Sequence, residues 1–444
     1  MNRRLSESLL LLAVSTGSCL AQNPMPSPAQ APTTAPATGR SLTLREAEAF
    51  ALQKNPQITV GNLRAMQAHE FVREARSALM PTANLSITGV QSRAGSRIAA
   101  GYLNNPVIYP RTAAGASVSQ LITDFGRTNN LVSSSQFQAK AEDENAVATR
   151  QQIVLAVDEA FYNTPESQAL LQVAHDTVEA RQLLVDQVKA LTDAKLKSAL
   201  DLSFSNVDLG RAKLLQLDSQ SNYQASLSTL SAILGYSDRQ DFTLVDPAEQ
   251  TVPPSQDATP LIQQALQLRP EVHSLEDEVS AATKFSKAEH DLWWPTISAS
   301  GVVGLAPVRD PHIDNWYGAA GVNINIPVFN GFLFNARAKS ADLDTRAKQQ
   351  RLQDLQNNVA RDVRNAWLDT QKAYERLSLT QQLREQANLA LDLAQARYKL
   401  GLGSIVEYSQ ANLQKTEADL QDTDARYQYH VSQLVLAYTM GLSR

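Results

Sequence analysis

The sequence predicts an α+β fold dominated by α-helix, in which a pair of strands followed by a long helical hairpin occurs twice. Three observations predict this fold: an internal duplication, long apolar stripes at helical spacing, and short segments in which apolar and polar residues alternate. Of the 444 residues, 43% are hydrophobic, which is ample for a core. The single cysteine excludes a disulfide scaffold.

The duplication spans most of the chain. A shift of 206 residues superimposes Leu196 on Leu402, and the residues around them follow without a gap. Nearer the N-terminus the shift becomes 214, where Pro81 matches Pro295. The difference between the shifts arises between these prolines and the second strand of each half, so it predicts a longer hairpin loop in the first half.

Four regions are expected along the chain. They are a signal peptide at 1–21, a Pro/Ala-rich linker at 22–40, a first structural repeat at 41–247 and a second structural repeat at 248–444. The expected strands lie at about 82–98 and 112–122 and at about 296–307 and 317–328. The expected long helices lie at about 127–234 and 334–440.

The N-terminal residues are typical of an export signal. Two arginines precede an apolar segment at Leu9–Val14, and small residues before Gln22 provide a cleavage site. The alternative is that Cys19 carries a lipid anchor. This alternative is less favoured because Thr16 stands three residues before it, where lipoprotein signals usually carry leucine.

Each half contains a long helical stripe. Apolar residues recur every three or four positions over 352–377, and no proline lies within 335–444. A helix of about 65 residues can therefore extend to about Leu400, roughly 100 Å at 1.5 Å per residue, before a turn and a returning helix. In the first half Pro165 removes one backbone hydrogen bond, so we expect a kink or a local break there.

The strand pairs alternate with period two. In Gly318–Val328, Val322 and Ile324 alternate with Asn323 and Asn325, so one face is apolar and the other is polar. Aromatic residues lie near the strand ends, as they do in membrane barrels, at Trp293, Trp294, Trp316, Tyr317, Phe329, Phe332, Phe334, Tyr102 and Tyr109. The pattern favours a membrane barrel whose lumen the asparagines face, and a water-facing sheet stays open as the alternative.

Four strands in one chain cannot close a barrel, and an open strand edge in lipid leaves backbone groups unsatisfied. Chains that cross a membrane with these strands must therefore combine them. Eight strands from two chains would fill their interior with side chains, whereas twelve strands from three chains would leave a lumen. A conducting function requires three chains.

The order of elements and a set of short motifs resemble the TolC-like outer-membrane efflux protein family over nearly the whole mature chain. The motifs are Leu42–Ala47 with Asn55-Pro56, Asp124–Gly126 and Phe329–Gly331 after the strand pairs, and Ala396–Gly401 leading into Ser404–Glu407. The resemblance implies a homotrimer whose 12-stranded outer-membrane β-barrel is continuous with a periplasmic α-helical barrel. It also implies outer-membrane lipid around the strands and two partners, a periplasmic adaptor protein and an inner-membrane pump.

The two tip turns between the long helices form the candidate site. The 206-residue shift carries Asp201 onto Glu407, so a trimer would bring six carboxylates towards its axis as a periplasmic gate. The alternative is a simple helix N-terminal acid, which the helix macrodipole favours. The residues expected to contact the adaptor are Lys195, Lys197, Ser198, Gly401, Gly403 and Ser404.

The sequence departs from the family pattern at both tips. Lys195 and Lys197 stand where the second half has glycines, which leaves the turn geometry and the adaptor contact open there. Gln410 stands where some members of the family carry a second acid, so a doubled acidic ring is not expected.

No catalytic residue, cofactor or metal site is predicted. The six histidines are scattered without the spacing of metal ligands, and Cys19 in the signal region cannot serve the mature chain as a nucleophile. A net charge of −5 argues against a nucleic-acid partner. The family resemblance therefore implies an export duct of a tripartite efflux or type I secretion system, and the residues do not predict an enzyme. The alternative is an exported coiled-coil scaffold or adaptor without a pore.

Overall fold

The computed structural model describes residues 40–91, 93, 111–245, 252–306 and 314–442. The predicted signal peptide, Cys19 and almost all of the predicted linker lie outside these residues. The same holds for residues 94–98 of the first predicted strand.

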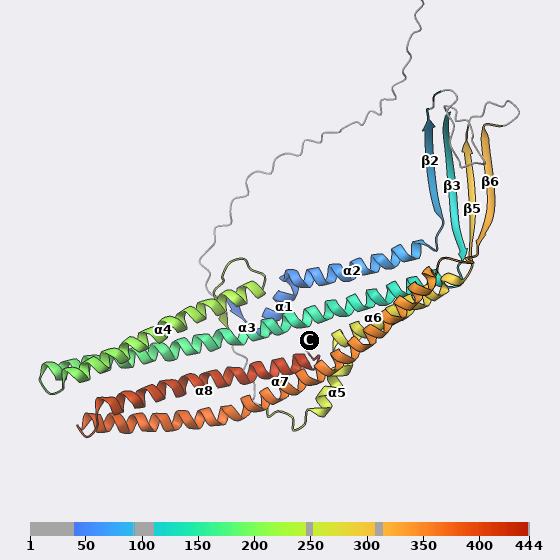
Figure 1. Cartoon of the computed structure of the whole chain (residues 1–444). Coiled ribbons are helices and arrows are strands. Elements are labelled where there is room, and N and C mark those ends of the chain that lie inside the picture. The colour runs from blue at the N-terminus through green and yellow to red at the C-terminus, as the bar shows by residue number, and fades with distance from the viewer. Residues whose placement is uncertain (1–39, 92, 94–110, 246–251, 307–313, 443–444) are drawn as a thin grey trace, which may run out of the picture.

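Figure 1 shows that each repeat combines short helices, a strand pair and a long helical hairpin. The first repeat contains β1 Arg40–Leu42, α1 Leu44–Lys54, α2 Pro56–Ser77, β2 Thr82–Val90, β3 Arg111–Thr123, α3 Arg127–Asp193, α4 Ala199–Ile233 and β4 Phe242–Leu244. The second contains α5 Thr259–Leu268, α6 Pro270–His290, a 3₁₀ turn at Asp291–Trp293, β5 Thr296–Leu305, β6 Trp316–Asn325, α7 Leu333–Lys399 and α8 Ile405–Thr439.

The helices and strands lie close to where the spacing of apolar residues in the sequence predicts them. α3 and α7 are each 67 residues long. β6 ends at Asn325, before the predicted 328, because Pro327 has no backbone N–H to donate to a neighbouring strand.

Pro165 does not break α3, which runs without interruption from Arg127 to Asp193. The prediction of a local break is therefore wrong. A proline inside a helix costs about 3 kcal/mol, and α3 gains more than this because it is packed along both flanks. Just before the proline, the Thr164 hydroxyl donates to the Ala160 carbonyl at 2.8 Å.

The helices form one layer in which α3 is internal. Near the sheet their order is α2–α3–α6–α7, and in the distal half it is α4–α3–α8–α7 (Figure 1). One edge of this layer is therefore made by α2 and α4, and the other edge by α7. Midway along the layer, α1 packs on α3, α5 packs on α7, and β1 pairs in parallel with β4.

The four longer strands form an antiparallel sheet in the order β2–β3–β5–β6. The pairing of β3 with β5 joins the two repeats, and it aligns Ala116 with Val303. Within the described chain β2 and β6 are the edges of this sheet. In both the sheet and the helical layer, elements of the first repeat therefore form one edge and elements of the second repeat form the other.

The strand register places the predicted apolar positions of all four strands on one face of the sheet and the polar positions on the other. One face gathers apolar and small residues, among them Leu85, Ile87, Ala116, Val118, Val303, Leu305, Val322 and Ile324. The opposite face gathers small and polar residues, among them Asn84, Ser86, Ser117, Ser119, Ser298, Ser300, Asn323 and Asn325. Leu85, Ile87 and Val322 are each about 70% exposed in the single chain. In the part of the chain that the structure describes, these residues of the apolar face are therefore left uncovered.

The hydrophobic core repeats with the sequence. The largest buried cluster lies where α1, α3 and α4 meet, and Val157, Phe161 and Leu230 are fully buried in it. The second repeat has a matching cluster. Each of its five buried members stands at the position of a first-repeat core residue: Ala265 for Ala51, Val272 for Ile58, Val359 for Ile153, Val363 for Val157 and Met440 for Leu234.

None of the described helices combines the length and the apolar character needed to span a membrane.

The strand register leads to a testable prediction about membrane insertion. Ile324 and Asn323 are neighbours in β6 but lie on opposite faces of the sheet. An arginine on a lipid face costs about 2–4 kcal/mol near the bilayer midplane and about 0–1 kcal/mol near the interfaces. Ile324 is the last residue but one of β6. We expect Ile324→Arg to lower the amount of folded protein in the membrane fraction, whereas Asn323→Arg leaves it unchanged. Equal tolerance at the two positions would refute the assigned faces.

Candidate functional site

The two predicted tip turns lie side by side at the end of the molecule farthest from the sheet (Figure 1). A buried cluster holds them together. It combines Leu184 and Val188 of α3 with Ala394 and Tyr398 of α7 and with Ile405, Tyr408 and Ala411 of α8. Because this cluster draws on both hairpins, it fixes one tip against the other.

The two turns have the same backbone geometry. At the first tip Lys195 has φ +60°, and Leu196 donates its N–H to the Leu191 carbonyl at 2.8 Å. At the second tip Gly401 has φ +75°, and Leu402 donates to the Arg397 carbonyl at 2.8 Å. Both are the left-handed helix ends usually made by glycine. The lysine therefore leaves the turn unchanged, although a left-handed residue with a side chain costs about 1–2 kcal/mol.

The residues after each turn cap the returning helices. At the first tip Ser198 and Asp201 cap each other reciprocally, and both backbone N–H to side-chain distances are 3.1 Å. At the second tip the Ser404 hydroxyl accepts the Glu407 N–H at 3.1 Å. Ser198 and Ser404 thus fix the helix starts, and Asp201 and Glu407 both lie in a first helical turn, where the macrodipole favours acids.

Beyond this shared position the two predicted gate acids have different partners. The Glu407 carboxylate forms an ion pair with Arg397, in which Arg397 Nε lies 3.0 Å from Glu407 Oε1. Both side chains are about half exposed. Gly403 borders this pair, since a Cβ there would lie 3.2 Å from the Glu407 carboxylate. Asp201 instead uses its carboxylate in the cap.

Lys197 links the first tip to the second. Its Nζ lies 4.0 Å from the centroid of the Tyr398 ring, which stacks on Tyr408 at 5.5 Å. The pKa of the Tyr398 hydroxyl is raised by burial and by the nearby negative charge of Asp201. A cation over a ring contributes about 0.5–2 kcal/mol. The sequence pattern does not predict either tyrosine, although Tyr398 lies within the Ala396–Gly401 motif.

A second connection lies one turn further from the tips. The Ser409 hydroxyl of α8 donates a hydrogen bond to the Asp208 carboxylate of α4. Together with Lys197 and Tyr398, this contact makes the two hairpins one mechanical unit at the tip. Opening the tip would require these contacts to break.

A titratable pair lies on the α3–α8 interface, midway along the hairpins. Glu166 of α3 is hydrogen bonded to Asp424 of α8, and Asp424 also pairs with Arg376 of α7 at 2.8 Å. Burial, then the charge of Asp424, raises the pKa of the Glu166 carboxyl to about 7, with a smaller opposing effect from Gln428. Glu166 therefore keeps its proton to a higher pH than an ordinary carboxyl group.

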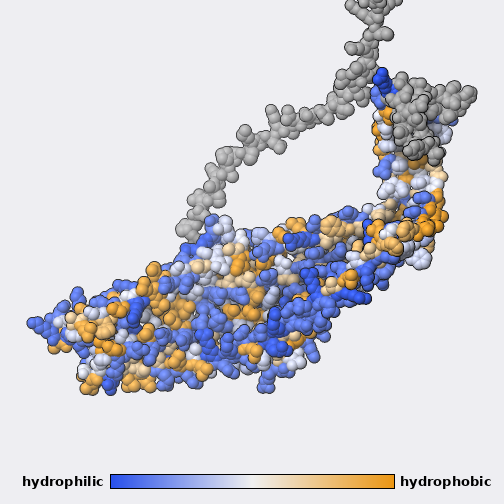
Figure 2. All heavy atoms as spheres, viewed as in Figure 1, coloured by the Kyte–Doolittle hydropathy of each residue, from blue (hydrophilic) through white to orange (hydrophobic). Residues whose placement is uncertain are grey.

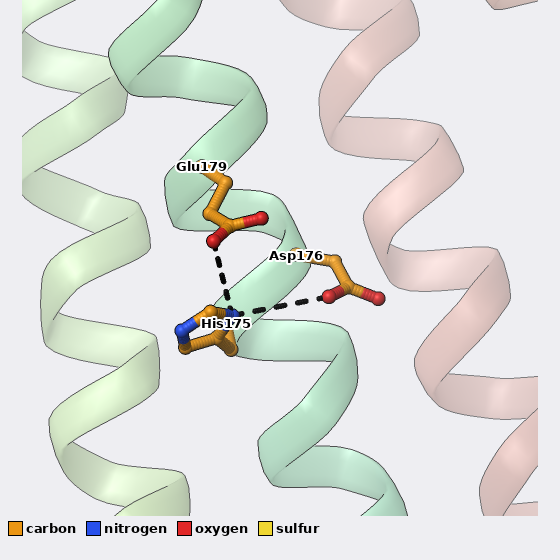
Figure 3. A group of neighbouring side chains, drawn as sticks. All are labelled: His175, Asp176 and Glu179. Atoms are coloured by element: carbon orange, nitrogen blue, oxygen red, sulfur yellow. Dashed lines mark ion pairs between the residues drawn. The ribbon is translucent and has the colours of Figure 1, made fainter.

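Among the described residues, one group of three side chains could hold a metal ion, and it contains His175. His175 Nδ1 lies 3.9 Å from Asp176 and 3.8 Å from Glu179, and Figure 3 shows the three side chains on a single helix. The i to i+4 spacing of His175 and Glu179 is the signal that could have found it. All three side chains are exposed and come from adjacent turns of α3.

Comparison with known proteins defines the class of protein to which this chain belongs. A model of the family described as outer membrane efflux protein matches residues 50–236 and 261–442. The outer membrane protein TolC of Escherichia coli K12 is 22% identical over 417 residues, covering 87% of this chain and 80% of that protein. The outer membrane protein OprJ of Pseudomonas aeruginosa is 22% identical, covering 90% and 84%. The Campylobacter jejuni CmeC outer membrane channel superimposes with a TM-score of 0.78 at 17% identity, covering 90% and 86%.

These matches place the protein among transport proteins rather than enzymes. The chain belongs to the outer membrane efflux protein family. The TolC-like resemblance and the predicted fold class are confirmed. As a member of this family, the protein is an outer-membrane protein with a large periplasmic part.

The Glu166 pair predicts how stability depends on pH. Between the ordinary carboxyl value of 4.5 and the folded value of about 7, the folded state binds more protons than the unfolded state. Stability therefore falls as pH rises through this window. We expect Glu166→Gln to remove this fall and to raise the melting temperature above pH 7, as followed by circular dichroism. Asp186→Asn, an exposed acid on the same helix, is the control and should keep the wild-type profile. An unchanged profile in Glu166→Gln would contradict the assignment.

Proposed function

We propose that this protein is the outer-membrane channel of a tripartite efflux or type I secretion system. It is a passive duct that carries substrates to the outside from a periplasmic adaptor and an inner-membrane pump. The proposal rests on the shape of one chain, which forms an open wall. The edge strand β2 and the helices α2 and α4 lie on one side of this wall, and the edge strand β6 and the helix α7 lie on the other.

The open wall favours closure by further copies of the chain. In lipid the free backbone groups of β2 and β6 must find partners, and pairing β6 of one copy with β2 of the next satisfies them. The same step brings α7 of one copy against α2 and α4 of the next. Such a head-to-tail contact generates a ring when the rotation between neighbouring copies closes. Channels of this family are trimers, and three copies give twelve strands around a lumen.

Apolar residues on the helical edges support the same contact. Leu200, Val207 and Leu214 of α4 recur every seven residues, and they are 63%, 51% and 63% exposed. α7 carries exposed leucines near the same end of the layer, at 379, 383, 389 and 393. Apolar residues at heptad spacing are typical of helix–helix seams. A neighbouring copy would cover both stripes.

The proposal is tested by stoichiometry and by conductance. Mass measurement of the detergent-purified protein should give three chains, and the protein should form channels in planar bilayers. It should also stay in the outer-membrane fraction after salt and carbonate washes. A protein that washes off, or that is monomeric and silent in bilayers, would support the exported scaffold instead.

We also infer a role for the tip. Asp201 and Glu407 are the acids of a periplasmic gate, and the adaptor contacts the residues around them: Lys195, Lys197, Ser198, Gly401, Gly403 and Ser404. The exposed side of both turns and their common end position support this assignment. Two carboxylates about 10 Å apart repel by about 0.4 kcal/mol in water and about 1.7 kcal/mol at a dielectric of 20. A ring of them favours multivalent cations.

The gate assignment predicts cation block. Divalent or trivalent cations on the periplasmic side should reduce single-channel current, and Glu407→Gln should weaken this block. Asp201→Gln should act in the same direction but less, because Lys195 and Lys197 lie near it in the chain. Arg397→Gln should strengthen the block, since it frees the Glu407 charge.

Gln410→Ala is the matched control for the gate residues, because it changes a neighbouring side chain without changing charge. If the double variant Asp201→Gln, Glu407→Gln keeps wild-type block and selectivity, Asp201 serves only its helix cap and Glu407 only its ion pair with Arg397.

A further inference from the structure

One row across the sheet has an unusual composition. The register aligns Ser86 of β2 with Gly115 of β3, Gly115 with Gly304 of β5, and Gly304 with Tyr317 of β6. These four residues lie on the small and polar face, and Tyr317 is the one aromatic residue on that face of the described strands. The row lies near the strand ends farthest from the helices (Figure 1).

The Tyr317 side chain lies along this row. A Cβ added to Gly304 would stand 2.6 Å from both Cζ and Oη of Tyr317. A Cβ added to Gly115, one strand further on, would stand 2.5 Å from the same Oη. The ring therefore crosses β5 and ends above β3. Only the absence of side chains at both glycines permits this course, since real Cβ contacts do not come below 3.0 Å.

Backbone conformation does not explain these glycines. Neither Gly115 nor Gly304 has a positive φ, so any residue could adopt the backbone found there. Glycine within a strand is unfavourable unless another group approaches closely. Here the group that approaches is the Tyr317 phenol.

We propose that Gly115 and Gly304 form a trough in the channel wall that holds Tyr317 flat and so keeps the outer end of the lumen wide. The inference rests on the proposed channel function, in which three copies place three such rings at one level. With a side chain in the trough, each phenol must leave the wall and point into the lumen. The two glycines and Tyr317 thus determine how large a solute can pass this level.

Gly115→Ala is the decisive variant. Its new methyl group would meet chiefly the movable end of Tyr317, whereas Gly304→Ala would also meet the backbone carbonyl of Ala114 at 2.7 Å and disturb the sheet. Gly321→Ala is the matched control, because Gly321 lies on the same face of β6 and its added Cβ would have nothing within 4 Å.

Single-channel conductance in planar bilayers measures the effect, using assembled protein of verified mass. We expect Gly115→Ala to lower conductance, because the narrowed level adds its resistance to that of the tips in series. Gly321→Ala should match the wild type. The double variant Gly115→Ala, Tyr317→Ala should return to the wild-type value or above it, because the displaced ring is gone.

Several results would overturn the trough. These are wild-type conductance in Gly115→Ala, or a double variant that conducts as poorly as the single variant. If Gly115→Ala fails to assemble, Tyr317→Ala decides: a ring on the wall leaves conductance almost unchanged on removal, whereas a large rise shows that it already fills the lumen. A silent wild-type protein refutes the channel function itself, and a conducting wild type with an unaffected Gly115→Ala refutes only the trough.

Discussion

The architecture depends on the junction between the two repeats. At this junction β3 pairs with β5, and α3 packs against α6 near the sheet and against α8 near the tips. The backbone hydrogen bonds of the internal strands and the burial of α3 are satisfied there within one chain. In the described sheet the unpaired edges, β2 and β6, therefore lie on the two outer sides, and so do the exposed apolar residues of α4 and α7. A single chain is for this reason a stable piece of wall and not a closed object.

The duplication conserves packing while it allows charge to diverge. The second-repeat core reuses the positions of the first-repeat core, because the same helices must bury the same face. The tips keep the same left-handed turn even where Lys195 replaces the glycine found at 401. The charged residues differ: Asp201 closes a capping box, and Glu407 pairs with Arg397. One backbone design thus presents two different surfaces to whatever binds the tip.

The polar contacts described above across the seam between the two hairpins lie at two levels. Lys197 over Tyr398 and Ser409 with Asp208 act near the tip, and Glu166 with Asp424 acts midway. A buried carboxyl beside a carboxylate is costly to ionise. The seam is therefore weaker at high pH at the level of Glu166, while the aromatic contact at the tip is unaffected by the same proton.

The sequence by itself determined which segments are helix and strand, where the tips lie and which faces are apolar. Apolar spacing is a local property, and the duplication fixed both repeats at once. The alternation of apolar and polar residues correctly placed Asn323 and Ile324 on opposite faces of the sheet, as the strand register shows. It allowed for a local break at Pro165 that does not occur, because the loss of one hydrogen bond is local whereas the packing that offsets it is tertiary.

Only the tertiary structure decided the partners. A periodic pattern states which way a residue faces and not which distant residue meets it. The Tyr398 ring is reached by a lysine from the other repeat, Glu166 meets Asp424 across the seam, and Tyr317 crosses two glycines on different strands. Each of these contacts joins positions far apart in the chain through strand register or helix packing, and those are set by the whole fold.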